Sequence, residues 1–429
     1  MTYSETTDYI FSKLPMFSRV GSEAIKIGFT NILALCEKLG NPQNNCKYVH
    51  IAGTNGKGSV SHMMAAILQT AGYKTGLYTS PHLKDLRERI KINGKEISEA
   101  DLVDFIGKLK TEIETIKPSF FEITVAMAFD HFANHGCDIA VIETGLGGRL
   151  DSTNIISPEI SVITNIGLDH VQILGETLAE IATEKAGIIK PGTTVVIGES
   201  HPETEKVFEE FAIKNNSEII FADRKLQVTN WQYENEELAV EVASEHQVDH
   251  KKYHLDLTGN YQIKNLLPVI AATQVLQEKG WQIEQEHVVK GLQHAKKITG
   301  LHGRWETISH SPRIIMDVAH NPDGVQQLLN QLEITTYHNL HIVLGMVKDK
   351  DVAKVLSMLP KNAKYYFSNA HVPRAMPAGD LKEKALLNDL HGKVFDDVND
   401  AIRTAKSMAH KDDLILIFGS VFLVGEVSG

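Results

Sequence analysis

The sequence predicts a two-domain α/β protein, in which a parallel-sheet domain with a phosphate-binding loop precedes a smaller α/β domain. Short apolar segments alternate with helical patterns along most of the chain, which is typical of parallel sheets covered on both faces by helices. A glycine-rich segment, GTNGKGS, begins at Gly53 between a predicted strand and a predicted helix. The chain has 429 residues, and this length favours two hydrophobic cores over one.

The first domain is predicted as a series of strand and helix units. Apolar residues recur at helical spacing from Glu23 to Gly40, and Gly40 and Pro42 follow as stop signals. The further predicted elements are a strand at 47–53, a helix at 59–72, a strand at 74–80, a helix opened by Ser98 and Asp101, a helix at 120–136, strands at 137–145 and 160–167, a helix opened by Thr177 and Glu180, and a strand at 193–199.

The pattern changes towards the second domain. Between Leu226 and Leu257 short polar and apolar runs alternate, which predicts an antiparallel patch at the edge of the first domain. Helices are expected from Tyr261 to Gly280 and around 287–294. We place the domain boundary near Thr299, giving domains 1–298 and 299–429. The second is expected to be Rossmann-like, with strands at 313–320, 339–346, 363–370 and 413–420 and a helix starting at Asn321–Pro322.

Composition narrows the possible partners. The net charge of −11 argues against a general nucleic-acid surface, because such surfaces need clustered Lys and Arg. The longest apolar run, from Leu414, is too short to span a bilayer, so no membrane partner is expected. The three cysteines, Cys36, Cys46 and Cys137, show no CxxC spacing and are expected to be small core residues of a reduced, cytoplasmic protein.

The glycine-rich segment departs from the usual P-loop pattern GxxxxGK[ST]. Ile51 takes the first Gly position, and Gly58 separates Lys57 from Ser59. The glycines still allow backbone N–H groups to face an anion, Lys57 adds a point charge, and the next helix presents its positive end. A simple glycine-rich turn is the alternative. The predicted phosphate-binding residues are Gly53, Thr54, Asn55, Gly56, Lys57, Gly58 and Ser59.

Four motifs together resemble one family. Besides GTNGKGS, they are ETGLGGRLDSTN at 143–154, TNIGLDH at 164–170 and EKAGIIKPG around Lys185. Their residues and their order resemble the motifs of the Mur ligase superfamily and, within it, those of the folylpolyglutamate synthase and dihydrofolate synthase family. The resemblance covers nearly the whole chain.

The resemblance implies a set of metal-binding residues. It assigns Ser80, Glu143 and His170 to Mg²⁺, with two ions expected and K⁺ as a further cofactor. It also implies that Lys185 is carbamylated by CO₂ and so carries a negative charge that helps to position magnesium. The residues alone would not have suggested His170, since imidazole is an unusual Mg²⁺ ligand, nor Lys185, which reads as a solvated helix residue.

Further residues follow from the same resemblance. It places Asn265 of GNYQIKN, Arg304 of GRWE and Asp317 of MDVAHNP at the nucleotide, ATP, and His320 near the reaction centre. Arg304 suits phosphate because its guanidinium offers a planar fork of donors. Val318 stands where the family more often has glycine.

The acceptor-binding residues also come from the resemblance. Phe121 and Glu122 of SFFE, Asp151 and Ser152 after the second motif, and Arg19 of FSRV resemble pterin-binding elements of the family. Phe120 and Phe121 lie side by side in a predicted helix, so one of them is expected to be a core residue.

The predicted activity is an ATP-dependent ligase that joins L-glutamate to dihydropteroate and to reduced folates through an acyl phosphate. The protein is expected to be a monomer whose domains close on the reaction and exclude water, with Arg304 and Asp317 approaching the phosphate loop only when closed. The alternatives are a UDP-muramyl amino-acid ligase, which would carry a further N-terminal domain, and a nucleotide-binding switch without ligase activity.

Overall fold

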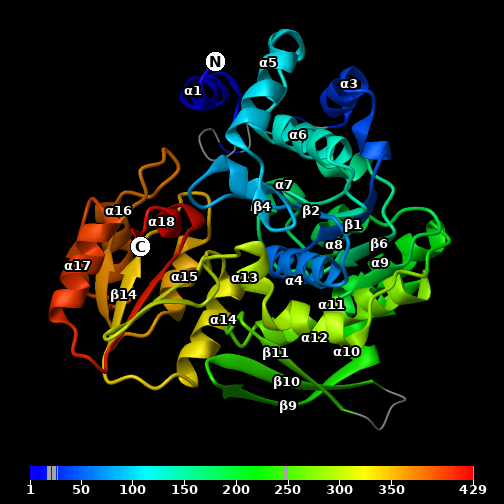
Figure 1. The fold of residues 1–429 in the computed structure, drawn as a ribbon. Helices are drawn as coiled ribbons and strands as arrows, with labels where there is room; N and C mark the ends of the chain where they lie inside the picture. Colours follow the sequence, from blue (N-terminus) through cyan, green and yellow to red (C-terminus); the bar gives the residue numbers. More distant parts are fainter. Residues whose placement is uncertain (17–20, 22–25, 27, 245–249, 429) are drawn as a thin grey trace. The chain divides into compact units, whose positions relative to one another are not determined.

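The computed structural model describes residues 1–16, 21, 26, 28–244 and 250–428. The chain forms two compact units, shown as a ribbon in Figure 1. The first comprises Met1–Gly167, Val171–Asp256 and Gln262–Leu301. The second comprises His302–Gly429 together with two short segments from earlier in the chain, Leu168–His170 and Leu257–Tyr261.

The first unit is built on a largely parallel sheet with the strand order β4-β3-β2-β5-β1-β6-β7-β8. The strands from β2 to β8 in this order are parallel neighbours, whereas β3 and β4 form an antiparallel hairpin at one edge. The bounds are β1 Lys47–Ala52, β2 Thr75–Tyr78, β3 Ile90–Ile92, β4 Lys95–Glu96, β5 Ile139–Glu143, β6 Ile160–Ile163, β7 Val195–Ile197 and β8 Ile219–Phe221.

Helices pack on this sheet in separate clusters. Helix α4 contacts β2 and β5 and also α11, α12 and α13. Tyr48 and Tyr78 of this sheet lie in a hydrophobic core cluster with residues of α5 and α6. The helix bounds are α1 Tyr3–Lys13, α3 Thr30–Lys38, α4 Lys57–Thr70, α5 Glu99–Ile116, α6 Phe120–Asn134, α7 Val171–Leu174, α8 Leu178–Ala186, α9 Pro202–Lys214, α10 Ala222–Lys225, α11 Gln262–Glu278, α12 Gln285–Gln293 and α13 Ala295–Thr299, with 3₁₀ turns at Pro42–Asn44, Leu86–Arg89 and Ser152–Ile155.

A small antiparallel sheet completes the first unit. Strands β9 (Leu226–Glu234), β10 (Glu237–Ser244) and β11 (Lys251–Leu255) form it in the order β11-β10-β9. The change of sequence pattern at Leu226 predicts this sheet, because alternation at a period of two residues is typical of strands with one solvated face.

The second unit contains a six-stranded sheet in the order β12-β13-β17-β14-β15-β16. All neighbours are parallel except β12 and β13, which pair as an antiparallel hairpin. The bounds are β12 Glu306–His310, β13 Arg313–Met316, β14 Leu340–Leu344, β15 Lys364–Phe367, β16 Gly392–Val394, β17 Leu414–Phe418, α14 Pro322–Glu333, α15 Val352–Met358, α16 Ala378–Leu386, α17 Val398–Met408 and α18 Val421–Gly425. The fold class predicted for both parts of the chain is confirmed.

Some local expectations differ from the structure. Helix α4 begins at Lys57 rather than Ser59, so the lysine of the phosphate loop is the first helical residue. The helix predicted from Glu23 starts at Thr30 within the described residues, and positions 22–25 lie outside them. Cys36 and Cys137 are buried as expected, but Cys46 is only half-buried. Among the described residues, no helix is long and apolar enough to cross a membrane.

Asp413 connects the starts of two central strands of the second unit. Its side chain is fully buried and accepts hydrogen bonds from the backbone N–H groups of His410 (2.8 Å) and Asn339 (3.0 Å), while His341 Nε2 lies 3.3 Å from Oδ2. Burial by itself would raise the pKa of Asp413, but these donors outweigh it and lower the pKa to about 2. The native carboxylate is therefore stabilised relative to the unfolded chain.

We expect Asp413→Asn to lower the free energy of unfolding by about 2 kcal/mol at neutral pH, because the amide cannot accept all of these donors. The unfolded chain takes up a proton at this residue near pH 4, whereas the native chain does so only near pH 2. The carboxylate's contribution is therefore present above about pH 4 and is lost towards pH 2. Thermal melts of both proteins from pH 7 to pH 3 should show the difference shrinking as the pH falls. A constant difference would contradict this origin.

Candidate functional site

The glycine-rich loop lies between β1 and α4 and depends on the absence of side chains at two positions. Gly53 has φ +150°, and a Cβ there would lie 1.8 Å from Thr164 Oγ1. Gly56 has φ +84°, and a Cβ there would lie 2.2 Å from Asn265 Oδ1. Because neither contact leaves room for another residue, the loop is pressed against both Thr164 and Asn265.

Hydrogen bonds fix the loop to the segment that follows β6. The N–H of Thr54 donates to the Asn165 carbonyl oxygen (3.0 Å), and the N–H of Asn55 donates to the Asn165 side-chain oxygen (2.9 Å). Thr54 Oγ1 accepts from the N–H of Gly167 at 2.9 Å. This segment is the start of the TNIGLDH motif, so two of the motifs found in the sequence form one structural unit.

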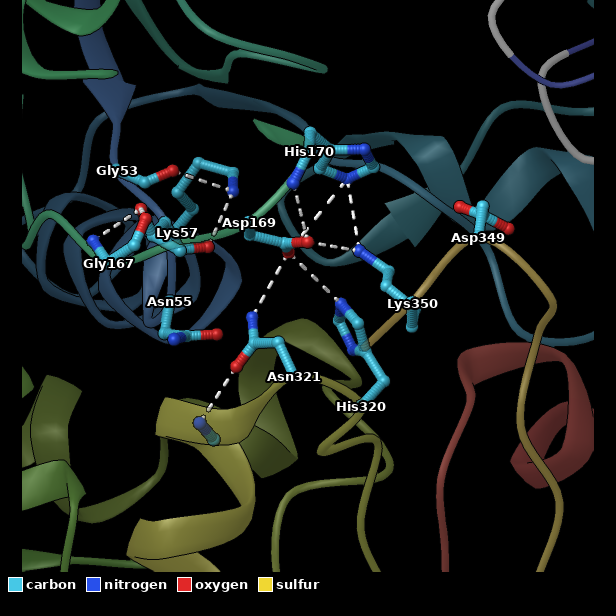
Figure 2. A network of polar contacts seen from close by, with 12 residues as sticks. Gly53, Asn55, Lys57, Gly167, Asp169, His170, His320, Asn321, Asp349 and Lys350 are labelled. Atoms are coloured by element: carbon cyan, nitrogen blue, oxygen red, sulfur yellow. Dashed lines mark hydrogen bonds and ion pairs between the residues drawn. The ribbon is translucent and has the colours of Figure 1, made fainter. Parts of the chain in front are cut away.

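Two lysines converge on one carbonyl of the loop. Lys57 Nζ donates to the Gly53 carbonyl oxygen at 3.0 Å (Figure 2) and to the Thr54 carbonyl oxygen at 3.1 Å. Lys185 Nζ donates to the same Gly53 oxygen at 2.9 Å, and this lysine is only 3% exposed. Both positive charges therefore stand at a loop that precedes a helix N-terminus, an arrangement that attracts anions. The interpretation of Lys185 as a solvated helix residue is wrong.

Gln262 belongs to this site, although the sequence does not predict it. It lies at the start of α11, is fully buried and donates from Nε2 to Ser59 Oγ at 3.1 Å. Its Oε1 accepts from Asn265 Nδ2 at 2.8 Å. Gln262 thus links the helix that follows the loop to Asn265, which packs on Gly56. The motif GNYQIKN contains Gln262, but nothing in its spacing distinguishes this glutamine.

Ser80 and Glu143 lie just after β2 and at the end of β5. The N–H of Ser80 donates to Glu143 Oε2 at 3.1 Å, and Glu143 is 4% exposed. The structure thus brings these two predicted metal ligands together. A carboxylate and a hydroxyl are the oxygen ligands that Mg²⁺ prefers, so the donor set of this pair fits the ion.

A second polar cluster, built within the second unit, is centred on Asp169. Its Oδ1 lies 2.5 Å from Lys350 Nζ, and its Oδ2 accepts from Asn321 Nδ2 at 3.1 Å and lies 3.6 Å from His320 Nε2 (Figure 2). Burial acts to raise the pKa of Asp169, but the contacts with His320 and Lys350 hold it well below its usual range. The carboxylate stays ionised and holds these positively charged and polar groups in place.

Lys350 also contacts the predicted metal ligand His170. Lys350 Nζ lies 3.2 Å from His170 Nε2, and His170 has a positive φ of 52°. Lys350 therefore contacts both the Asp169 carboxylate and the His170 imidazole. Sequence patterns do not predict Asp169 or Lys350 as site residues, because a single Asp and a Lys in the run KDKD carry no distinctive spacing.

Asp317 and Arg304 lie near the first strand pair of the second unit. Asp317 is 3% exposed and accepts from Tyr261 Oη (2.6 Å), Trp305 N–H (2.8 Å) and Ala319 N–H (2.8 Å). Burial raises its pKa, against the opposing effect of these hydrogen bonds and of Arg304. Asp317 therefore fixes the backbone around Trp305, next to Arg304.

The predicted pterin-binding residues have clear structural contacts. Phe120 is buried at 4% exposure and is the core residue of the pair. Phe121 is half-buried, and a Cβ at Gly145 would lie 2.4 Å from its ring. Asp151 Oδ2 accepts from the N–H of Gly145 at 2.9 Å, so Phe121 and Asp151 meet at the same loop.

Two of these carboxylates also organise the local backbone. Glu122 Oε2 accepts from Ser119 N–H at 2.6 Å in a capping box, whereas its buried Oε1 has no hydrogen-bond partner among the described residues. Asp151 caps the 3₁₀ turn that begins at Ser152, and burial raises its pKa. Ser152 is buried. Arg19 lies outside the described residues.

Comparisons with known protein families define the class first. Residues 51–273 match the Mur ligase middle domain, and residues 303–421 match the Mur ligase glutamate ligase domain. Both parts of the chain therefore belong to the Mur ligase class, in agreement with the geometry of the loop and the two sheets.

Individual relatives narrow the class. The dihydrofolate synthase/folylpolyglutamate synthase of Buchnera aphidicola subsp. Schizaphis graminum is 34% identical over 91% of this chain and 90% of its own length. The folylpolyglutamate synthase of Lacticaseibacillus casei is 32% identical over 100% and 98%. The structure of Escherichia coli FolC in complex with DHPP and ADP superposes with a TM-score of 0.85 and 28% identity, covering 99% of this chain and 96% of FolC. The chain belongs to the folylpolyglutamate synthase/dihydrofolate synthase family.

Proposed function

We propose that this protein is an ATP-dependent ligase that joins L-glutamate to dihydropteroate and, by γ-linked extension, to reduced folates. The observation that carries the proposal is the pair of lysines at Gly53 in a loop of the family's type, 3.0 and 2.9 Å from one carbonyl oxygen. The names of two relatives support dihydropteroate and reduced folates as the acceptors. One relative is a dihydrofolate synthase/folylpolyglutamate synthase, and the other is a folylpolyglutamate synthase. Composition favours a cytoplasmic enzyme, and we propose that it acts as a monomer.

The first chemical step transfers the γ-phosphoryl group of ATP to a carboxylate of the acceptor, giving an acyl phosphate and ADP. Negative charge spreads over the transferred phosphoryl oxygens, so Lys57 and Arg304 act by electrostatic stabilisation. Bound Mg²⁺ would supply further positive charge, and Ser80, Glu143 and His170 are the residues proposed to hold it. We propose that the domains 1–298 and 299–429 both supply groups to the nucleotide, through Asn265 from the first and Asp317 from the second.

In the second step the amine of glutamate attacks the acyl carbon, and phosphate leaves. The attacking amine must lose a proton, and His320 is suited to accept one. Its Nδ1 donates to the Val318 carbonyl oxygen at 2.8 Å, which leaves the lone pair on Nε2, 3.6 Å from Asp169 Oδ2. A proton accepted at Nε2 would lie beside the Asp169 carboxylate.

The acceptor is proposed to bind at the start of α6 and the loop after β5. Phe121 offers a partly exposed ring for a pterin, and the unpartnered Oε1 of Glu122 is a hydrogen-bond acceptor at nearly zero exposure. Asp151 positions the loop after β5 by accepting a hydrogen bond from the N–H of Gly145. Ser152 and Arg19 complete the proposed set.

Two further proposals concern the cofactors, namely a carbamate on Lys185 and a bound K⁺. Lys185 Nζ donates to Gly53, so carbamylation would replace this contact with an anion beside the loop. Such a carbamate needs a cation next to it, which magnesium would provide. K⁺ is proposed from the family alone.

Gln262→Leu should raise the KM for ATP about tenfold with a smaller change in kcat, because Ser59 and Asn265 would lose a buried partner at the phosphate loop. Steady-state phosphate release measures both constants. Gln277→Leu, at the exposed end of the same helix, is the matched control and should leave KM unchanged. An equal shift in both variants would show that only helix stability is affected.

Phosphate release from ATP and Mg²⁺ in the presence of glutamate tests the proposed function. Three acceptors are compared: dihydropteroate, tetrahydrofolate and a UDP-muramyl precursor, each with and without glutamate. Release with both pterin acids is the expected result, and release with tetrahydrofolate alone would limit the activity to polyglutamylation. Release only with the UDP-muramyl precursor would replace the proposal by the cell-wall alternative. Release that needs no acceptor would favour a nucleotide-binding switch.

A further inference from the structure

A cluster of possible metal ligands lies between α5 and α6, at residues to which the proposed reaction gives no role. Among the described residues, Asp101, His131 and His135 bring one ligand atom each to within 4.8 Å of one another. Asp101 lies in the first turn of α5, His131 in the last turn of α6, and His135 caps the end of α6. The two histidines are spaced i, i+4, so they project from the same side of the helix.

We propose that Asp101, His131 and His135 bind a zinc ion that joins the start of α5 to the end of α6. Two imidazole nitrogens and one carboxylate oxygen form a donor set that late first-row divalent metals prefer, whereas Mg²⁺ prefers oxygen ligands. Ligand atoms around tetrahedral zinc stand about 3.3 Å apart, so small side-chain rotations would close the site. The fourth position would hold water.

Local hydrogen bonds orient these side chains for coordination. His135 Nδ1 donates to the His131 carbonyl oxygen at 2.9 Å, so its proton is on Nδ1 and the lone pair is on Nε2. A metal-binding histidine is commonly fixed in this way, by a hydrogen bond from its other ring nitrogen to a carbonyl. The two imidazole rings lie with their centroids 4.2 Å apart. Asp101 Oδ2 accepts from Ser98 Oγ at 2.8 Å, which holds the carboxylate and leaves Oδ1 for the ion.

Burial and charge around the cluster are compatible with a cation. His131 is 8% exposed, and the Asp101 carboxylate brings a negative charge to within reach of both imidazoles. Lys74 is the opposing charge, but its ammonium donates to the His135 carbonyl oxygen and is held at the backbone. The cluster also lies at the C-terminal end of α6, where the helix dipole favours a positive ion.

Zinc binding by the full-length protein, free of any histidine tag and stripped with a chelator, tests the proposal. Isothermal titration with Zn²⁺ is made in excess Mg²⁺, which occupies oxygen-rich sites. We expect one equivalent to bind and to raise Tm. His135→Gln, an exposed and conservative change, should weaken zinc binding at least about tenfold and abolish the shift in Tm. Asp101→Asn should weaken binding too.

His391→Gln, at an exposed histidine of the second unit, is the matched control and should bind zinc as the unchanged protein does. Co²⁺ serves as a second probe, because its visible spectrum reports a site with nitrogen ligands, and this spectrum should be lost in His135→Gln. The ligase activity in Mg²⁺ alone should be the same in His135→Gln as in the unchanged protein. Absent zinc binding, or zinc binding that His135→Gln and Asp101→Asn leave unaltered, would overturn the proposal.

Discussion

Lys185→Ala is expected to lower ATP-dependent phosphate release by about 100- to 1,000-fold while the protein stays folded. The expectation follows from the place of the Lys185 side chain, which is 3% exposed and donates to the Gly53 carbonyl oxygen at 2.9 Å. Loss of one fixed charge at the site of phosphoryl transfer typically costs this much in rate. Steady-state assays with saturating ATP measure the effect, and circular dichroism checks the fold.

Lys190→Ala is the matched control for this variant. Lys190 is a partly buried lysine just after α8, and its Nζ also donates to a backbone carbonyl oxygen, that of Asn154, at 2.7 Å. It binds a different carbonyl, so its loss should reduce stability without a comparable loss of rate. If both variants lost activity equally, packing rather than charge at Gly53 would explain the result.

Chemical rescue of Lys185→Ala separates the two possible states of the lysine. If the functional group is a carbamate, formate or acetate should restore part of the activity, because a small carboxylate can take its place. If the functional group is the ammonium, methylamine should restore activity instead. Rescue by neither, together with near-normal activity of the variant, would remove Lys185 from the mechanism.

The different outcomes for Lys185 and the phosphate loop show what local sequence can predict. The loop was predicted from residue types within seven positions, because glycines and a lysine between a strand and a helix have one common use. The burial of Lys185 depends on Gly53, which is 132 positions earlier in the chain. Helical pattern and a neighbouring Glu gave the wrong environment for this lysine, and only the family resemblance indicated its importance.

Most of the longer strands and helices followed from periodicity, although α9 was not predicted, and several short strands were missed. β3, β4, β8 and β16 contain two or three residues each, too few to show a repeat. The hairpin β12–β13 was half predicted, since only its second strand has a continuous apolar run. These strands form by pairing with neighbours that were already recognisable, so tertiary contacts decide them.

Polar clusters were the least predictable part of the candidate site. Asp169, Lys350 and His320 are far apart in the sequence, and no spacing rule connects them. Asp151 and Glu122 were predicted as ligands from the resemblance, whereas the structure shows that both also hold backbone N–H groups in caps. Such dual use cannot be read from residue type, because the same carboxylate serves either purpose.

The ion pair between Asp169 and Lys350 provides the second large expected effect. Both side chains are nearly inaccessible, at 10% and 7% exposure, and lie 2.5 Å apart. Lys350→Met should lower the stability of the second unit by about 3 kcal/mol, because Asp169 would remain buried with a weaker set of partners. Trp305 is buried in the second unit, so its fluorescence reports unfolding there, once Trp231 and Trp281 of the first unit are replaced by Phe in all variants compared.

Lys348→Met is the control, since Lys348 is exposed and its ammonium group donates to the Pro373 carbonyl oxygen. In a double-mutant cycle, Asp169→Asn combined with Lys350→Met should cost less than the sum of the single changes by about 1–3 kcal/mol. The same cycle, with kcat measured in place of stability, distinguishes a purely structural role of Lys350 from a role in the reaction. Because Lys350 also lies 3.2 Å from His170 Nε2, its loss should change the Mg²⁺ dependence of the rate if it competes with the metal for that nitrogen. Additive costs together with an unchanged Mg²⁺ dependence would mean that Asp169 is held by His320 and Asn321 alone.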